Sequence, residues 1–374
     1  MATSKLFAPF TLNGLTLTNR IVMAPMTRNF SPGGVPGPDV AAYYRRRAEG
    51  GTGLILTEGT APNHPQARNL PNVPKMYGEE ALAGWKRVVD EVHAAGGKIF
   101  SQLWHVGAVQ IPGTPTLPVS PTSPSGLLKP GVKVGEPMTQ VDIDAVIEGF
   151  AQGAANAKKV GFDGIEIHGA HGYIIDEFFW DGTNQRTDKY GGDLVARTRF
   201  AVEIIRECRR RVGPSFPMQI RISQWKGQEF NARLANTPQE LARFLEPLVA
   251  AGIDAFHCST RRFWEPEFGG SDLNFAGWTK KLTGKPTTTV GSVTLDLDFI
   301  VSMGRAPAPA GKPAESDGRA AHFDRLLEML DRGDFDLVAV GRAMLADPNW
   351  AAKVREGQFE QLNPFSPEVL KTLA

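Results

Sequence analysis

Two histidines and a tyrosine stand within one stretch of six residues, and together they could act on a substrate that carries an activated oxygen. His168 and His171 are separated by two residues, and Tyr173 follows His171 with one residue between them. Two imidazole side chains can donate hydrogen bonds to the same oxygen, which would hold and polarise a carbonyl or nitro group. A tyrosine hydroxyl, with an ordinary pKa of about 10, could supply a proton. The stretch therefore predicts a site for oxygen binding and proton transfer.

The same pair of histidines has two other interpretations. His168 and His171 could be two ligands of a zinc ion, and such a site would need a third protein ligand, for which His105 or His257 could be considered. A zinc-dependent barrel hydrolase is therefore the alternative function, although our main expectation includes no metal. Loop histidines without a chemical role are the other alternative.

Two polar side chains lie at or within apolar runs and need partners there. Arg221 lies inside the run 218–223, where an unpaired charge is costly. Its partner could be a bound group with negative charge, or a strand carboxylate such as Glu58 or Glu166. Gln102 can both donate and accept hydrogen bonds, which suits recognition of the polar edge of a ring. Trp104 either lines the substrate site or packs in the floor of the domain.

The elements that must position these residues follow a regular pattern. Eight short, continuous apolar runs alternate with helix-like segments, which is typical of parallel strands buried on both faces. The expected strands are Arg20–Met26, Gly53–Thr57, Lys98–Trp104, Gly164–His168, Met218–Ser223, Ala255–Cys258, Pro286–Val290 and Leu337–Val340. We therefore predict an α/β fold, a single (β/α)8 TIM barrel spanning residues 1–374. The carboxyl ends of barrel strands form the active-site face, so the candidate residues should meet there.

The helices and loops between the strands also carry signals. Thr139 with Asp142 resembles a capping box, and Gly161 marks the end of the same helix. The turn at Leu12–Leu15 predicts an N-terminal hairpin that could close the bottom of the barrel. Long inserted loops are expected after strands 3, 6 and 7, at Val109–Met138, Ser259–Asp272 and Ser292–Arg319. A doubly wound sheet is the competing fold, but the chain has no Gly-x-Gly-x-x-Gly turn.

A phosphate site is expected at the loops after strands seven and eight. Barrel enzymes often bind phosphate there, and Gly291, Ser292, Gly341 and Arg342 stand at those positions. Glycines allow backbone N–H groups to approach a phosphate, and an arginine adds a charged fork. Alternatively, Gly341 and Arg342 only begin a helix on the surface.

Composition narrows the class of protein. The 41 basic and 40 acidic residues give a net charge of +1, so we expect no nucleic-acid or membrane partner. Two cysteines cannot form a disulfide framework or a four-cysteine iron–sulfur cluster, and their use fits a reducing, cytoplasmic location. No uncharged apolar run is long enough to span a membrane. A homo-oligomer and a monomer both remain open.

In this order, the motifs resemble those of the old yellow enzyme family of FMN-dependent ene reductases. The resemblance extends from Leu6 to Leu345 and includes the run Arg186–Gly192 followed by Arg197 and Phe200. It implies a tightly but non-covalently bound FMN, held by Pro25, Met26, Thr27, Gly59, Gln102, Arg221, Gly291, Ser292, Gly341 and Arg342. It also implies that His168 and His171, with Trp104, bind the substrate and that Tyr173 donates a proton.

The activity implied by this resemblance is ping-pong hydride transfer. NAD(P)H reduces the flavin, which then reduces the C=C bond of an α,β-unsaturated carbonyl or nitro compound. A dienoyl-CoA reductase arrangement is excluded by the 374-residue length and the two separated cysteines, whereas a non-catalytic flavin-binding barrel remains a further alternative. We also expect Phe263 and Trp264 to cap the substrate. The physiological substrate, the choice between NADH and NADPH, and the stereochemical outcome are not encoded in these motifs.

Overall fold

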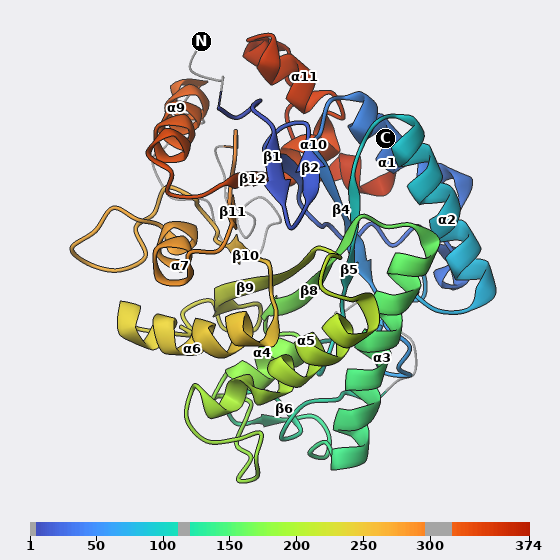
Figure 1. Ribbon diagram of the computed structural model, residues 1–374, viewed down its shortest axis with the longest axis vertical. Coiled ribbons are helices and arrows are strands. Elements are labelled where there is room, and N and C mark those ends of the chain that lie inside the picture. The colour runs from blue at the N-terminus through green and yellow to red at the C-terminus, as the bar shows by residue number, and fades with distance from the viewer. Residues whose placement is uncertain (1–4, 111–119, 296–315) are drawn as a thin grey trace.

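The chain folds around a closed barrel of eight parallel strands, in a computed structural model that describes residues 5–110, 120–295 and 316–374 (Figure 1). The strands are β3 (Ile21–Met23), β4 (Leu54–Thr60), β5 (Ile99–Leu103), β8 (Gly164–His171), β9 (Met218–Lys226), β10 (Ala255–Ser259), β11 (Thr287–Val290) and β12 (Leu337–Val340). Each pairs with the next along the chain, and β12 pairs with β3 to close the circle. The predicted (β/α)8 barrel is confirmed.

Three strands run three residues further than the sequence indicated: β4, which continues to Thr60 instead of Thr57, and β8 and β9. The prediction ended β8 at His168 and β9 at Ser223, whereas the structure continues them to His171 and Lys226. The added residues pair beyond an irregularity in the register, where His171 lies opposite Lys226. The extensions contain polar residues such as His171 and Lys226, so a search for apolar runs does not detect them as strand.

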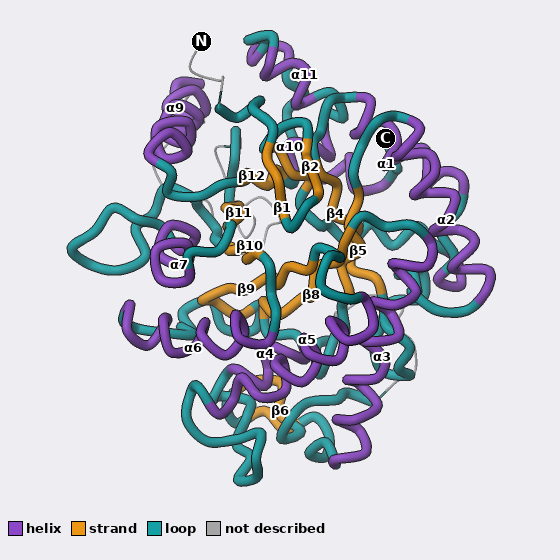
Figure 2. Tube along the Cα trace, in the orientation of Figure 1, coloured by secondary structure: helices purple, strands orange, loops and turns teal. Residues whose placement is uncertain are grey.

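Helices surround the strands, as Figure 2 shows by colour. The α-helices are α1 (Pro38–Glu49), α2 (Glu79–Ala94), α3 (Gln140–Val160), α4 (Ile174–Phe179), α5 (Arg199–Val212), α6 (Pro238–Ala251), α7 (Phe275–Thr283), α9 (Ser316–Arg332), α10 (Arg342–Ala346) and α11 (Trp350–Arg355). Short 3-10 turns are η1 (Pro32–Gly34), η2 (Ala196–Thr198), η3 (Phe359–Gln361) and η4 (Pro367–Lys371). The capping box of Thr139 and Asp142 is present at the start of α3, and Gly161 ends that helix in the left-handed conformation.

The N-terminal hairpin closes one end of the barrel, as predicted. Strands β1 (Phe10–Leu12) and β2 (Leu15–Leu17) are antiparallel, and the turn residues Asn13 and Gly14 both have positive φ. That conformation matches the right-handed twist of a two-residue hairpin. Leu12 and Leu17 pack with apolar side chains from inside the barrel, including Phe100. The hairpin therefore seals the apolar end and leaves the opposite mouth for the site.

The inserted loops are described only in part. Within the first, strands β6 (Leu127–Lys129) and β7 (Val132–Lys133) form a small antiparallel pair. Residues 111–119 of that insertion and 296–315 of the one after β11 lie outside the described residues. Among the residues that are described, no helix combines the length and apolarity needed to cross a membrane.

Candidate active site

The carboxyl ends of several strands meet at the mouth of the barrel. Gly341, after β12, lies close to the loop after β3: a β-carbon on Gly341 would be 3.5 Å from Met26 Sδ. Gly59, near the end of β4, lies against the Trp104 ring, and a β-carbon there would be 2.5 Å from Trp104 Cε3. Glycine at position 59 is therefore needed for the close approach of two strand ends.

The structure brings His168, His171 and Tyr173 together with Trp104. The ring of His168 is 5.1 Å from that of His171 and 5.0 Å from that of Tyr173, and both contacts are edge-on. The Trp104 ring meets Tyr173 edge-on at 5.1 Å. A cluster with this geometry could hold a small ligand by its oxygen and donate a proton to a neighbouring atom of that ligand, and it joins the ends of β5 and β8.

The protonation of His168 follows from its surroundings. Burial, with the nearby charge of Arg221 as the next cause, holds the pKa of His168 well below its usual value. The ring is therefore neutral at pH 7. Its Nδ1 accepts a hydrogen bond from the Ala170 N–H at 3.3 Å, which leaves the proton on Nε2. His168 is thus a neutral donor through Nε2.

His171 is also held neutral, and its backbone is unusual. Burial and the charge of Arg221 keep its pKa well below the ordinary range. Its Nε2 lies 2.8 Å from Ser259 Oγ, and its ring stacks on Trp225 at 4.6 Å. The backbone has φ of 65°, a left-handed conformation that costs a non-glycine residue about 1–3 kcal/mol unless its surroundings fix it. Such strain often marks a functional site.

Arg221 is buried, and it has neither of the two carboxylate partners that the sequence analysis considered. Its Nη2 donates to Ser259 Oγ at 3.2 Å, and its Nε is buried without a hydrogen bond in the described part of the chain. No ion pair joins it to Glu58 or Glu166 within the described residues. An unsatisfied guanidinium beside the histidine cluster is expected where an anionic or carbonyl-bearing group binds.

Glu166 gathers three side-chain donors beneath this cluster. It accepts hydrogen bonds from Gln102 Nε2 at 2.6 Å and Gln219 Nε2 at 2.7 Å, and its Oε2 lies 2.7 Å from His257 Nδ1. Burial alone would raise the pKa of Glu166, but the charge and hydrogen bond of His257, the charge of Arg221 and the hydrogen bond from Gln102 hold it below its usual value. The carboxylate therefore stays ionised and fixes the Gln102 amide, whose oxygen becomes the acceptor available to a ligand.

The loop after β3 is anchored from two sides that the sequence did not reveal. Glu58 accepts hydrogen bonds from the backbone N–H groups of Arg28 and Asn29. The Arg28 guanidinium donates to backbone carbonyls of Val369, Leu370 and Thr372, near the end of the chain. Pro25 is buried here, whereas Thr27 is exposed at the mouth. The candidate cofactor residues 25–27 therefore stand on a rigid support.

The expected phosphate loops lie close to each other. Arg342 Nη2 lies 3.4 Å from Ser292 Oγ, and Ser292 has φ of 53° just after Gly291 at 147°. Arg342 also begins α10, as the alternative interpretation expected, and the phosphate role of these residues stays a prediction. A β-carbon on Gly291 would lie 2.8 Å from Thr260 O, which explains the glycine. The four residues are thus gathered at one side of the mouth.

One expectation about the sixth loop is wrong. Phe263 is fully buried in the core, and Asn274 Nδ2 binds its carbonyl oxygen at 2.7 Å. It cannot cap a substrate, because its ring fills space between the barrel and its helices. Trp264 is partly buried and stacks on His322 at 3.8 Å, which ties loop six to α9.

The buried charges that sequence reasoning missed lie next to the site. Lys226 and Asp176 form an ion pair with both side chains fully buried.

The zinc alternative finds no third ligand at His105. His105 Nε2 lies 2.9 Å from His64 Nδ1, so His105 is bound to another histidine and not to His168 or His171. Among the described residues, no group of three His, Cys, Asp or Glu side chains is arranged for a metal ion. In the sequence, the only indication of these buried polar contacts was that polar residues stand at the ends of the strands.

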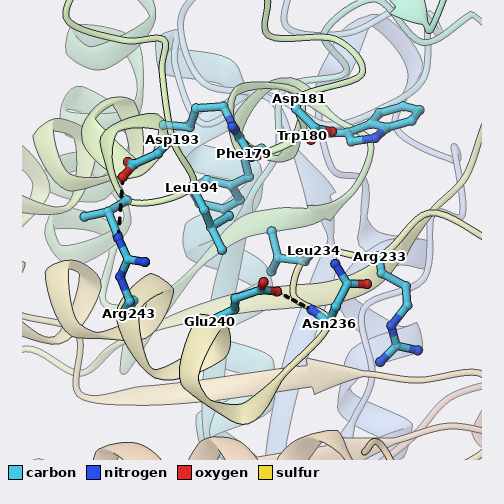
Figure 3. A pocket seen from close by; sticks show the side chains of 12 residues that line it. Phe179, Trp180, Asp181, Asp193, Leu194, Arg233, Leu234, Asn236, Glu240 and Arg243 are labelled. Atoms are coloured by element: carbon cyan, nitrogen blue, oxygen red, sulfur yellow. Dashed lines mark hydrogen bonds and ion pairs between the residues drawn. The ribbon is translucent and has the colours of Figure 1, made fainter.

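A separate cavity of about 240 Å³ lies between the loops after β8 and β9 and helix α6 (Figure 3). None of the candidate site residues lines it. Its charged groups are largely engaged, since Arg197 donates to backbone carbonyls and Arg243 lies 3.5 Å from Asp193. The cavity is therefore distinct from the barrel mouth.

The barrel is closed by the hairpin at one end and has a polar cluster around the buried Arg221 at the other. This arrangement is typical of (β/α)8 proteins that bind a ligand or catalyse a reaction at the mouth of the barrel. A profile of the NADH:flavin oxidoreductase / NADH oxidase family matches residues 5–308. The chain therefore belongs to that family, which includes the old yellow enzymes.

Individual relatives agree with this assignment. The chain is 33% identical over 369 residues to an NADH oxidase of Thermoanaerobacter brockii, covering 96% of this chain and 52% of that protein. It is 43% identical over 221 residues to 12-oxophytodienoate reductase 7 of Oryza sativa, covering 56% of each. It is 31% identical to 12-oxophytodienoate reductase 2 of Arabidopsis thaliana, covering 92% and 86%. The chain thus spans little more than half the length of the first two.

Solved structures extend the likeness to the whole fold. Morphinone reductase in complex with tetrahydroNAD superposes with a TM-score of 0.77 at 28% identity. The superposition covers 98% of this chain and 93% of that one. The overall fold is therefore shared with a reductase whose solved structure contains tetrahydroNAD.

Proposed function

We propose that this protein is an FMN-dependent ene reductase that uses NAD(P)H to reduce the C=C bond of α,β-unsaturated carbonyl or nitro compounds. The observation that carries the proposal is the link between two groups of residues. Ser259 Oγ contacts both Arg221, on the cofactor side, and His171, on the substrate side. A redox cofactor and an oxygen-bearing substrate would thereby lie next to each other.

The donor set fits FMN. When bound, FMN supplies hydride transfer from NAD(P)H to the alkene. The unsatisfied Arg221 Nε and the Glu166-oriented Gln102 suit the polar pyrimidine edge of the ring, while Pro25, Met26, Thr27 and Gly59 approach the ring with backbone and side chain. Its phosphate would lie at Gly291, Ser292, Gly341 and Arg342. The whole chain, residues 1–374, would then be one FMN-binding domain.

The chain's own residues would hold and protonate the substrate. His168 donates through Nε2, and His171 exchanges its Ser259 contact for the substrate oxygen, so that two N–H groups polarise the activating carbonyl or nitro group. Polarisation makes the β-carbon electrophilic. Tyr173, which lies edge-on to His168, protonates the α-carbon, and Trp104 packs against the tyrosine.

The reductant is expected to share the substrate site. The morphinone reductase structure contains tetrahydroNAD, and the present chain has no Gly-x-Gly-x-x-Gly turn for a separate dinucleotide domain. NAD(P)H and alkene would therefore bind in turn, which gives ping-pong kinetics. We place this activity in the cytoplasm, because the two cysteines suit a reducing compartment.

The first test is the visible absorption spectrum of the purified protein. A flavin spectrum that bleaches with anaerobic NAD(P)H and returns with an activated alkene would support the proposal. A colourless protein that takes up no added FMN would contradict it. Metal analysis of the same sample tests the zinc hydrolase, for which no observation in the described residues supplies a third ligand.

The proton-donor assignment has its own test. Tyr173→Phe should slow the alkene half-reaction by about 10²–10⁴-fold, the usual contribution of general acid catalysis, and leave flavin reduction nearly unchanged. Tyr77→Phe, away from the cluster, is the matched control. Equal slowing of both half-reactions, or of neither, would refute the assignment.

The histidine pair is tested by ligand binding. Replacing both His168 and His171 with Ala should weaken binding of a phenol, because we expect the two histidines to bind its oxygen as they would bind the substrate oxygen, while FMN remains bound. Loss of FMN from a folded double variant would assign the pair to the cofactor instead.

A further inference from the structure

The turn His171–Tyr173, here the His–Tyr turn, has a backbone conformation that requires outside support. His171 and Gly172 both have positive φ, 65° and 76°. A β-carbon on Gly172 would lie 2.0 Å from Gln228 Oε1, so a larger residue would displace that side chain as well as strain the backbone. A residue other than glycine, such as His171, rarely holds this conformation unless its neighbours enforce it. The direction of the His171 and Tyr173 side chains therefore depends on those neighbours.

The extended end of β9 supplies most of this support. The His171 N–H donates to Ser223 Oγ at 3.0 Å, and the Gly227 N–H donates to the His171 carbonyl at 3.0 Å. Gln228 Nε2 donates to the Gly172 carbonyl at 3.1 Å. Three of the four backbone polar groups of His171 and Gly172 are thus bound by β9 and the residues that follow it.

The fourth group, the Gly172 N–H, is bound by a buried carboxylate. Gly172 N–H donates to Asp176 Oδ2 at 2.7 Å. The other oxygen, Oδ1, lies 2.5 Å from Lys226 Nζ, and both side chains are fully buried. Burial raises the pKa of Asp176, and the charge of Lys226 is the largest influence that opposes this rise. The lysine therefore favours the ionised carboxylate, in which neither oxygen carries a proton and Oδ2 is free to accept from the Gly172 N–H.

We propose that Asp176 is a positioning residue of the reductase: its carboxylate, which Lys226 keeps as an acceptor, fixes the Gly172 N–H and thereby aims His171 and Tyr173 at the substrate. The inference rests on the proposed function. Lys226 is the residue that lies opposite His171 in the strand register. The pair joins β9 to the first turn of α4, so it holds the two sides of the His–Tyr turn together.

A role in core stability alone does not account for the pair. A buried ion pair is often no more stable than a well-packed apolar pair of similar volume. An apolar residue at position 176, however, would leave the Gly172 N–H without an acceptor in a buried turn. The hydrogen bond to Gly172 is therefore the property that distinguishes this pair from packing.

Two double variants separate these explanations. Lys226→Met with Asp176→Asn removes both charges but keeps an acceptor oxygen near Gly172. Lys226→Met with Asp176→Leu removes the same charges and the acceptor as well. Lys86→Met, at the exposed ion pair with Asp90, is the surface control.

Three readouts apply to each FMN-loaded variant. Hydrogen exchange of the peptide containing Gly172 reports on the turn itself. The dissociation constant of 4-chlorophenol, followed by flavin absorbance, reports on the histidines. Stopped-flow measurement of the alkene half-reaction reports on Tyr173, with FMN content and the thermal midpoint recorded alongside.

The Met/Asn variant should stay near wild type. The Met/Leu variant should exchange faster, bind the phenol more weakly and reduce the alkene more slowly, each by about tenfold or more, with full FMN content, because small misplacement of reacting groups is costly. Equal behaviour of the two variants would overturn the proposal. Loss of folding in the Met/Leu chain alone would assign the pair to the core and would also overturn it.

Failure of the proposed function would look different. A wild-type protein that binds no FMN and reduces no alkene refutes the reductase, whereas the exchange comparison still reports whether Asp176 holds the His–Tyr turn. Faster exchange at the turn with unchanged phenol binding and alkene reduction would instead refute the positioning role itself.

Discussion

Glu58 tests how burial changes the pKa of a carboxylate beside the loop after β3, which carries the candidate cofactor residues 25–27. Its side chain is 1% exposed, and its Oε2 accepts hydrogen bonds from the N–H groups of Arg28 at 2.8 Å and Asn29 at 2.9 Å. Burial raises the pKa of Glu58 from 4.5 to about 7, although these hydrogen bonds and the charge of Arg28 oppose the rise. The folded chain therefore binds this proton more tightly than the unfolded chain does.

The sign of the effect on stability follows from this difference. Because the folded-state pKa is raised, the contribution of Glu58 is fully present below pH 4.5 and is lost as the pH rises to about 7. At about 1.4 kcal/mol per pKa unit, the loss amounts to about 3 kcal/mol of unfolding free energy. This is a large part of the 5–15 kcal/mol typical of a folded protein.

Glu58→Gln removes the titration while keeping the shape and an acceptor oxygen. Guanidinium unfolding of wild type and variant, at constant ionic strength between about pH 4.5 and pH 8, gives the difference in unfolding free energy. We expect the wild type to lose about 3 kcal/mol relative to the variant across this range. The comparison cancels the other titrating groups, and the exposed Glu79→Gln controls for the substitution.

Two results would refute the reasoning. A difference that stays constant with pH would mean that Glu58 titrates alike in the folded and unfolded chains. A wild type that gains stability relative to Glu58→Gln as the pH rises would mean that Arg28 and the two N–H groups outweigh burial.

Three further predictions test other parts of the structure. Thr139→Ala removes the capping box of α3 and should lower the unfolding free energy by about 1 kcal/mol, measured with denaturant. Trp85→Ala empties a fully buried site and should cost about 3–5 kcal/mol in the same assay, and a cost near zero would mean that the core is looser than described. Glu166→Gln removes a buried negative charge near the proposed flavin and should raise the flavin reduction potential, whereas Arg221→Met should lower it; shifts of the opposite signs by spectroelectrochemistry would contradict this placement.

The barrel could be predicted from sequence because its outward-facing residues leave a clear pattern. Each strand places apolar side chains against the helices, as Ile165 and Ile167 do in β8 and Ile220 and Ile222 do in β9. The hairpin and the α3 cap follow equally local rules. These features depend on neighbours within a few residues, which a sequence displays directly.

The features that escaped prediction depend on distant partners. Lys226 reads as a surface residue because nothing near it in sequence indicates Asp176, which lies 50 positions earlier. Phe263 reads as a loop residue, yet Asn274 and the core fix it inside. A local pattern cannot show which polar residue will be buried when its partner comes from another strand.

The interior of the barrel nevertheless carries a signal that spans the whole chain. Alternate residues of β5, β8, β9 and β10 point inward and are polar near the mouth: Gln102, Glu166, His168, Gln219, Arg221, His257 and Ser259. The other side of the interior has an apolar cluster that includes Val22 of β3, Leu56 of β4 and Ala339 of β12. A barrel interior normally fills with branched apolar side chains.

This division of the interior fits a planar ligand with one polar and one apolar edge. The polar half contains Glu166, which is ionised, and Arg221, which makes no ion pair with it among the described residues, so a ring bound there would meet a positive charge along its polar edge. The strands that would recognise this ring also carry His168 and the extension that leads to Lys226. Under the proposed function, cofactor recognition, substrate binding and the support of the His–Tyr turn would therefore be built on neighbouring strands, and a change in any one of these strands should alter more than one of the three.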